Sequence, residues 1–227
     1  MYGGINLITL ENITKEYKVG SETLCVLQNI NLCVKQGEVL AIMGRSGCGK
    51  STLLNIIGGI VPPTSGEVWI EGTRIPFGEN QKLCNLRRSH IGYIVQNFAL
   101  INRKTVFENV ILPVQSREYR KNQYHKVKQL LQDFGIADKM NQYPYQLSNG
   151  EKQRVAIARA LVDDKKIILA DEPTGALDYA NAESVITILN KLAKERNVTV
   201  LVVTHDKEIA YKCDRTLQIV YGKIENQ

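Results

Sequence analysis

The sequence contains no apolar run long enough to cross a membrane as a helix. Its apolar stretches, such as Val39–Met43 and Val200–Val203, have the length of strands, whereas a membrane-spanning helix needs roughly 18 residues or more. The segment that follows Met1 has neither a basic region nor an apolar core. We therefore expect neither a membrane-spanning helix nor a secretory signal peptide.

Cysteine pairs with the spacing of a metal site are also missing. The five cysteines are odd in number and include no C-x-x-C pair. A disulfide framework or a zinc site is therefore not expected, and this cysteine usage favours a reducing cytoplasm.

What is present is the composition of a globular protein with an excess of positive charge. Of the 227 residues, 44% are hydrophobic and 23% are charged, close to the average of globular domains. This length suits one large domain, or one domain with an inserted lobe, and the composition excludes disordered and collagen-like chains. The formal net charge of +6 is by itself compatible with nucleic acid, an anionic membrane surface or phosphate-bearing ligands.

Short apolar runs alternate with segments of helical periodicity, which is the pattern of an α/β sheet. The clearest predicted strands are Val39–Met43, Ile91–Val95, Lys166–Ala170 and Val198–Thr204. Consecutive apolar residues in the first and third of them predict a parallel sheet covered by helices on both faces. Alternation within the first ~35 residues predicts a separate antiparallel sheet.

The strand pattern gives way to helices in the middle of the sequence. Thr105 and Glu108 have the spacing of a capping box, which opens a helix. The stretch Tyr124–Phe134 carries an apolar face and is followed by Gly135, which favours a helix end. We therefore predict one domain, with a β-subdomain and core formed by residues 1–96 and 152–227 and a helical subdomain formed by residues 97–151.

Residues 44–51 match the phosphate-binding pattern G-x-x-x-x-G-K-[ST] in full. They follow a predicted strand and precede a segment of helical composition, the context that the motif requires. Backbone N–H groups of such a loop turn toward phosphate oxygens, and the helix N-terminus adds a positive partial charge. Lys50 would reach the β- and γ-phosphates, and the Ser51 hydroxyl would bind Mg²⁺. The plainer alternative is a glycine-rich turn with an exposed lysine. The string that begins at Asn190 lacks the aspartate of a guanine-reading N-K-x-D motif, so GTP specificity is not supported.

Two adjacent carboxylates, Asp171 and Glu172, follow a predicted buried strand. Ligands of open α/β sheets bind at this carboxyl-terminal edge. Asp171 can hold Mg²⁺, and Glu172 can accept a proton from water that attacks the γ-phosphate. The alternative is a solvated acidic turn, which Pro173 would favour.

The stretch Leu147–Ala160, which begins Leu-Ser-Asn-Gly-Glu, resembles the signature motif of the ATPases of ATP-binding-cassette (ABC) transporters, usually L-S-G-G-Q. Further landmarks occur in the order of that family. Gln96 resembles the Q-loop glutamine, Ala176–Asp178 the D-loop, and His205 the switch histidine, while Tyr17 stands where the family stacks an aromatic ring on adenine. The resemblance spans nearly the whole chain. It implies an α/β fold, with a P-loop NTPase RecA-like core, an N-terminal antiparallel β-subdomain and an inserted α-helical subdomain.

The resemblance further implies an ATPase that uses ATP and Mg²⁺ as a homodimer, with each nucleotide held between the P-loop of one chain and the signature of the other. The residues implied in catalysis are Glu172, His205 and Lys50. The residues implied in nucleotide binding are Tyr17, Gly44, Arg45, Ser46, Gly47, Cys48, Gly49, Lys50, Ser51, Thr52, Gln96, Ser148, Asn149 and Gly150. The residues implied in metal binding are Ser51, Gln96 and Asp171.

Several of these positions have plainer interpretations. Ser148 and Glu151 form a capping box by themselves, although a capped helix N-terminus can also serve as an anion site. A histidine such as His205 is often a satisfied core residue. Tyr17 lies near an amphipathic strand, where a tyrosine often packs.

Two signature residues depart from the family pattern. Asn149 replaces a glycine, and because asparagine tolerates left-handed backbone angles we expect it to preserve a turn there. Glu151 replaces glutamine, which keeps the capping function and adds a negative charge near a phosphate site. That charge is expected to slow turnover rather than abolish it.

A finer resemblance concerns the kind of transporter. Residues 62–67 and 150–160 resemble the subgroup that serves lipoprotein release, macrolide export and resistance to antimicrobial peptides, which implies an exporter. The implied partners are a second copy of the chain and a separately encoded membrane-spanning permease, with peripheral contact to the inner face of the membrane and no nucleic acid. Alternatives are a regulatory ATPase of the cell-division type, a nucleic-acid or ribosome ATPase, and a metabolic P-loop kinase.

Part of the net charge gathers in the predicted helical subdomain. Five basic residues and one acidic residue lie within twelve positions there: Arg117, Glu118, Arg120, Lys121, Lys126 and Lys128. This segment is either a solvated helix surface or a surface attracted to anionic lipids or to an acidic patch of a membrane subunit.

Overall fold

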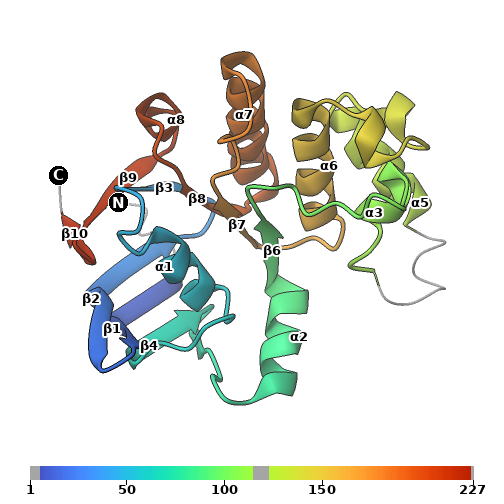
Figure 1. Ribbon diagram of the computed structural model, residues 1–227. Coiled ribbons are helices and arrows are strands. Elements are labelled where there is room, and N and C mark those ends of the chain that lie inside the picture. Colours follow the sequence, from blue (N-terminus) through green and yellow to red (C-terminus); the bar gives the residue numbers. More distant parts are fainter. Residues whose placement is uncertain (1–5, 115–122, 226–227) are drawn as a thin grey trace, which may run out of the picture.

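Five parallel strands form most of a six-stranded sheet in the computed structural model, which describes residues 6–114 and 123–225. The sheet has the order β10-β9-β3-β8-β7-β6, and β10 joins its edge antiparallel to β9 (Figure 1). Its strands are β3 (Val39–Met43), β6 (Ile91–Ile94), β7 (Ile167–Asp171), β8 (Thr199–Val203), β9 (Arg215–Val220) and β10 (Lys223–Glu225). The four strands predicted from apolar runs are thereby confirmed as neighbours in one parallel sheet.

Both faces of this sheet are buried, as the runs of consecutive apolar residues predict. In β7, Ile167 and Leu169 belong to one hydrophobic cluster, and Ile168 and Ala170 to another. Successive side chains of a strand point to opposite faces. Each face therefore needs an apolar cover, and an all-apolar strand is the result.

The second sheet is antiparallel and has the order β2-β1-β4-β5. Its strands are β1 (Asn6–Val19), β2 (Glu22–Lys35), β4 (Ser65–Ile70) and β5 (Thr73–Arg74). Helix α1 (Lys50–Ile57) contributes Leu53, Leu54, Ile56 and Ile57 to the cluster that it shares with both sheets. The alternating pattern of the first strands is therefore explained, because one face packs on this cluster and the other faces solvent.

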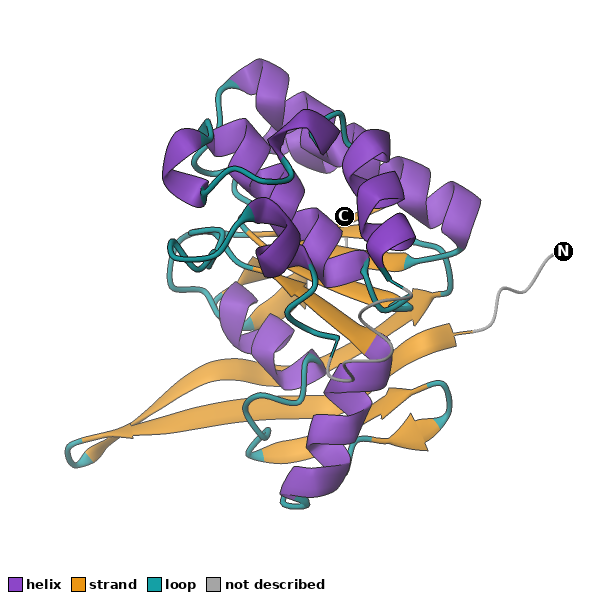
Figure 2. Ribbon diagram, turned by 90° about the vertical axis from the view of Figure 1, so that its right-hand side faces the viewer, coloured by secondary structure: helices purple, strands orange, loops and turns teal. Residues whose placement is uncertain are grey.

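The remaining helices pack on one or the other face of the parallel sheet or extend beyond it, and in Figure 2 most helices lie on one side of the long antiparallel strands. They are α2 (Asn80–His90), α3 (Val106–Val110), α5 (Tyr124–Asp133), α6 (Asn149–Leu161), α7 (Tyr179–Arg196) and α8 (Lys207–Tyr211), with 3₁₀ turns η1 (Ala137–Lys139) and η2 (Pro144–Gln146). Helices α3, α5, α6 and α7 share the second hydrophobic cluster. No helix of the described ranges is both long and apolar enough to span a membrane.

The predicted helix starts and ends of the middle segment agree with the structure. The Thr105 hydroxyl accepts from the Glu108 N–H at 3.2 Å, and the Glu108 carboxylate accepts from the Thr105 N–H at 2.8 Å, so the capping box opens α3. Gly135, with φ of 67°, follows the end of α5. Helix α6 runs continuously across the subdomain boundary that we predicted at residues 151/152.

The basic segment is only partly described. Arg117, Glu118, Arg120 and Lys121 lie outside the described residues. Lys126 forms an ion pair with Asp164, whereas Lys128 is exposed. The charge of Lys126 is therefore neutralised locally, which the count of sequence charges did not include.

Candidate functional site

The glycine-rich loop connects the end of β3 to the start of α1. Gly49 immediately precedes α1 with φ of 105°, in the left-handed region. A Cβ at this position would lie 2.8 Å from the Val26 carbonyl oxygen, so no other residue fits without displacing the backbone. Because Gly49 has no side chain to cap the helix, the first N–H groups of α1 have no side-chain cap. They form the arrangement that binds anions at helix N-termini.

The side chain of Lys50 lies inside this loop. It is 7% exposed, and its ammonium donates to the carbonyl oxygens of Gly44 at 2.9 Å and Arg45 at 3.0 Å. A buried cation is thus held by the backbone at the centre of the loop that the sequence assigned to phosphate.

Ser51 and Asp171 meet beside the loop. The Ser51 hydroxyl donates to Oδ1 of Asp171 at 3.0 Å. Burial raises the pKa of the Asp171 carboxyl and Glu172 raises it further, while the hydrogen bond from Ser51 and the charge of Lys50 oppose the rise. A hydroxyl and a carboxylate oxygen in contact are the donors that Mg²⁺ prefers, so these residues fit a magnesium ion.

Glu172 and His205 form a second polar pair. Nδ1 of His205 lies 2.8 Å from Oε2 of Glu172, and the two side chains are 69% and 16% exposed. An ionised carboxylate can only accept, so Nδ1 carries the proton in this contact. The alternative that His205 is a core residue is wrong, because its ring lies at the surface next to the acid.

The backbone of Glu172 adopts a conformation that is rare for a residue with a side chain. Its φ is 49°, and its N–H donates to the Val203 carbonyl at 3.0 Å. Non-glycine residues in the left-handed region carry strain that tends to gather at functional sites. This left-handed conformation lies directly after Asp171, the last residue of β7, at the edge of the sheet.

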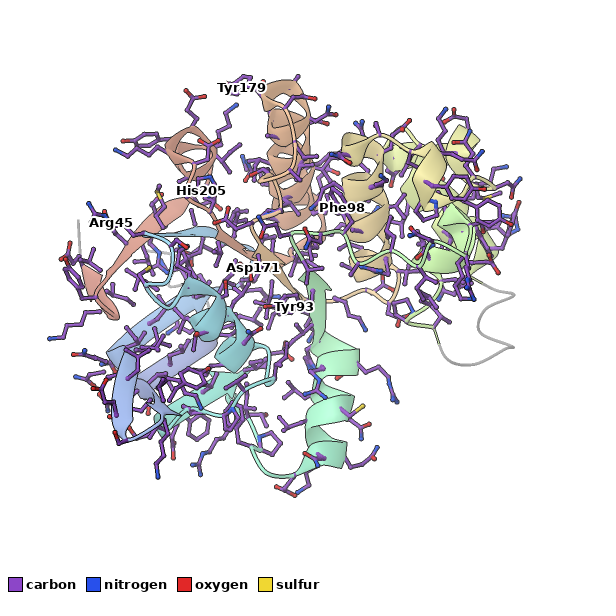
Figure 3. All side chains as sticks on the ribbon, viewed as in Figure 1. Arg45, Tyr93, Phe98, Asp171, Tyr179 and His205 are labelled. Atoms are coloured by element: carbon purple, nitrogen blue, oxygen red, sulfur yellow. The ribbon has the colours of Figure 1, made fainter. Side chains whose placement is uncertain are left out.

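These residues line one hollow of about 750 Å³. Figure 3 shows Asp171 at the end of β7 and His205 in the segment that connects β8 to α8. The predicted residues that the hollow brings together are Ser46, Gly47, Gly49, Lys50, Ser51, Thr52, Gln96, Asp171, Glu172 and His205. It also includes Val26, which we did not predict as a site residue. The alternation of apolar residues around Val26 predicts that it lies on the buried face of a strand. That pattern does not predict that this face lies next to the glycine-rich loop.

A second hollow of about 690 Å³ lies on the other side of the loop and is lined mainly by apolar groups. Val26, Ser46 and Gly47 line both hollows, and Cys48 and Arg45 line the second. Gly44 lines a third, with Arg45 and His205. Tyr17 lines none of the three; the residue is 38% exposed, and the Lys15 ammonium lies 5.0 Å from the centroid of its ring.

The signature residues stand apart from these hollows, at the start of α6. The Ser148 hydroxyl accepts from the Glu151 N–H at 3.3 Å, and the Glu151 carboxylate accepts from the Ser148 N–H at 2.8 Å, which completes the predicted capping box. The expectation that Asn149 forms a left-handed turn is wrong. Asn149 is the first residue of α6, lies outside the left-handed region, and its side-chain amide donates to the Ala176 carbonyl at 3.3 Å.

Comparison with known proteins agrees with this geometry. A family model described as "ABC transporter" matches residues 27–175. An uncharacterised ABC transporter ATP-binding protein of Bacillus subtilis, YvrO, is 43% identical over 96% of this chain and 95% of its own length. The macrolide export ATP-binding/permease protein MacB of Bartonella henselae is 42% identical over 96% of this chain, which spans only 33% of MacB.

Solved structures show the same fold. The ATP-binding cassette MJ0796 of Methanocaldococcus jannaschii has been described as a dimer in a post-hydrolysis state bound to ADP and Pi. Its TM-score to this chain is 0.85 at 41% identity, covering 96% of this chain and 97% of that one. CbiO1 of Clostridium perfringens, part of the transporter complex CbiONQ, reaches a TM-score of 0.85 at 30% identity, covering 98% of this chain and 88% of its own.

Proposed function

The chain belongs to the ABC transporter family, and we propose that it is the ATP-hydrolysing subunit of an exporter whose membrane-spanning subunit is a separate chain. One observation carries the proposal. The Ser51–Asp171 contact of 3.0 Å and the Glu172–His205 contact of 2.8 Å lie in the same hollow as the glycine-rich loop. This arrangement supports the proposal, because it would place a phosphate cradle, a metal-binding pair and a general base in one site.

ATP would bind with its phosphates along the loop. Lys50 and the N–H groups at the start of α1 would contact phosphate oxygens. Ser51, Asp171 and Gln96 would hold Mg²⁺, which when bound neutralises charge on the phosphates. Tyr17 remains the proposed stacking partner of adenine, and the apolar hollow beside Val26 offers the base a second surface.

Glu172 would act as the general base. Its carboxylate is largely buried but faces the hollow, so it can accept a proton from a water molecule placed opposite the γ-phosphate. His205 holds one carboxylate oxygen through its Nδ1 proton and thereby orients the acid. The other carboxylate oxygen remains for the water. His205 is also exposed enough to turn toward a γ-phosphate.

The site of one chain would be completed by a second copy. Ser148, Asn149 and Gly150 do not line the hollow that holds Lys50 and Glu172, yet they lie at the N-terminus of α6, and helix N-termini attract anions. A dimer in which Ser148–Gly150 of each chain faces the loop of the other brings both halves onto each ATP. MJ0796 has been solved as a dimer, which supports this arrangement.

The names of the relatives support the proposed direction of transport and the proposed partner. MacB is named a macrolide export ATP-binding/permease protein, and this chain spans 33% of it, whereas it spans 95% of YvrO, which is named an ATP-binding protein only. We infer a peripheral position on the cytoplasmic face of the membrane, against a permease supplied as another chain. No contact with nucleic acid is proposed.

The test replaces the proposed base. Glu172→Gln keeps the shape of the side chain but cannot accept the proton, so ATP hydrolysis should fall by about 100-fold or more. ATP binding should persist, and dimers formed with ATP should become long-lived in size-exclusion chromatography with light scattering. Glu11→Gln is the matched control, because Glu11 is exposed on β1. Normal hydrolysis by Glu172→Gln would overturn the role of Glu172.

A further inference from the structure

Two consecutive residues after Gln96 adopt left-handed backbone angles. Phe98 has φ of 58° and Ala99 has φ of 48°. A residue with a Cβ is disfavoured in this region, and two in succession are more strained than one. Such a conformation persists only where the surroundings hold it in place.

The holding contact comes from Arg159 on α6. Its Nη1 donates to the Ala99 carbonyl at 2.5 Å, and its Nη2 donates to the Phe98 carbonyl at 2.8 Å. The planar fork of a guanidinium matches two adjacent acceptors, which an ammonium cannot do with the same geometry. In Figure 3, Phe98 lies in the loop beside α6.

The Arg159 guanidinium binds backbone carbonyls of this loop rather than a carboxylate. Burial lowers the pKa of its guanidinium, and among the ion pairs of residues 6–114 and 123–225 none involves Arg159. A partly buried cation without a carboxylate partner is costly unless its donors are satisfied. Both carbonyl contacts fall on the two strained residues, so the cation and the strained turn stabilise each other.

The turn is continuous with Gln96. The Phe98 N–H donates to the Val95 carbonyl at 3.1 Å, and the Ala99 N–H donates to the Asn97 carbonyl at 2.5 Å. Gln96 lies between these anchors and is one of the residues that line the hollow, together with Ser51 and Asp171. A shift of the Phe98–Ala99 turn would therefore displace Gln96 from the hollow.

The far end of the same segment is held independently. The buried Asn109 side chain donates to the carbonyls of Ile101, Lys104 and Thr105 at 3.0–3.1 Å, and accepts from the Ile101 N–H at 2.8 Å. Loss of the Arg159 contact would thus free the end near Gln96 while α3 keeps the other end in place.

We propose that Arg159 is a positioning residue, which holds Gln96 at the metal-binding edge of the hollow by clamping the Phe98–Ala99 turn to α6. The proposal rests on the proposed function, because it gives Gln96 a role in binding Mg²⁺. The same helix begins at the signature residues, ten positions before Arg159. A movement of α6 at the signature end would therefore be transmitted to Gln96 within one chain.

The experiment compares Arg159→Met with Arg159→Lys and with Arg87→Met. Arg87 is the matched control, because its Nη1 also donates to a backbone carbonyl, that of Gly59, at 2.8 Å. In Arg159→Met, hydrogen–deuterium exchange should rise in the peptide covering residues 96–104. The Mg²⁺ concentration for half-maximal ATP hydrolysis should rise by about 10- to 100-fold, as for other residues that orient metal ligands, while ATP binding without Mg²⁺ stays within about twofold. Arg159→Lys should recover part of the Mg²⁺ affinity, and Arg87→Met should show neither effect.

Other outcomes would overturn the proposal. Unchanged exchange at 96–104 in Arg159→Met would show that the contact does not hold the turn. Increased exchange with wild-type dependence on Mg²⁺ would show that the turn does not position Gln96. Equal effects in Arg159→Met and Arg87→Met would indicate a general loss of stability. Wild-type protein that binds ATP but does not hydrolyse it would refute the proposed function instead, and the Mg²⁺ dependence of ATP binding would then replace hydrolysis as the measurement for Arg159.

Discussion

The hydroxyl of Ser51 donates a 3.0 Å hydrogen bond to Oδ1 of Asp171, although 120 positions separate the two residues. Ser51 belongs to the first turn of α1, and Asp171 ends β7. The contact joins the phosphate-binding loop to the acidic edge of the sheet.

Replacing this carboxylate separates nucleotide binding from the use of metal. Asp171→Asn keeps an acceptor for Ser51 but removes the charge. We expect ATP to bind in the absence of Mg²⁺ as in the wild type, with Mg²⁺-dependent hydrolysis reduced by about 100-fold. Titration of hydrolysis with Mg²⁺ and equilibrium binding of ATP in EDTA measure the two effects. Hydrolysis at the wild-type rate would exclude Asp171 from the metal site.

Variants of Tyr17 test whether adenine stacks on this aromatic ring, as the resemblance to the family implies. Removing a stacking partner from a base costs ~1–3 kcal/mol, so Tyr17→Ala should weaken ATP binding by about 5- to 150-fold. Tyr17→Phe should bind ATP like the wild type, since the ring remains. Calorimetric titration with ATP measures both. If Tyr17→Ala binds ATP normally, the ring only packs against Lys15.

A side chain at position 150 would clash with a residue of another helix, α7. A Cβ at Gly150 would lie 2.3 Å from the Asn181 side-chain oxygen. Gly150→Ala should therefore lower the free energy of unfolding by about 1–3 kcal/mol, measured by urea denaturation. Gly175→Ala is the control, because its nearest heavy atom would lie at 3.4 Å. Combining Gly150→Ala with Asn181→Ala should recover part of the loss, and a purely additive double variant would contradict the clash.

Burial should protect one cysteine from reagents. The pKa of the Cys213 thiol is raised to about 11 by burial and by the nearby Asp214. At pH 8 only about one thiol in a thousand is ionised at such a pKa, and the thiolate is the reactive form. Cys213 should react with a disulfide reagent far more slowly than the exposed Cys33, and its rate should rise about tenfold per pH unit up to pH 11. Comparison of Cys213→Ser with the wild type identifies the slow thiol, and rapid reaction at pH 8 would contradict the burial.

The parallel sheet and the phosphate-binding loop follow from the sequence because their signals are local. The residues of an all-apolar strand such as Ile167–Ala170 are enough to indicate that both of its faces are buried. The spacing of the glycines before Lys50 is likewise enough to predict the phosphate-binding loop. Asn149 shows the limit of local reasoning. Its tolerance of left-handed angles suggested a turn, but the capping box of Ser148 and Glu151 already starts the helix, so Asn149 lies in α6 and binds Ala176.

By itself, the sequence determined four strands of the parallel sheet, the phosphate loop, the acidic pair and the capping boxes of α3 and α6, since each depends on residues within a few positions of one another. Only the tertiary structure placed Ser51 against Asp171, Glu172 against His205 and Arg159 on the carbonyls of Phe98 and Ala99. These contacts join segments that are 33 to 120 positions apart, and no local pattern encodes such a distance. The first two arise where packing brings the carboxyl ends of the parallel strands β3, β7 and β8 to one edge of the sheet, and the third arises where α6 packs beside the loop that follows β6.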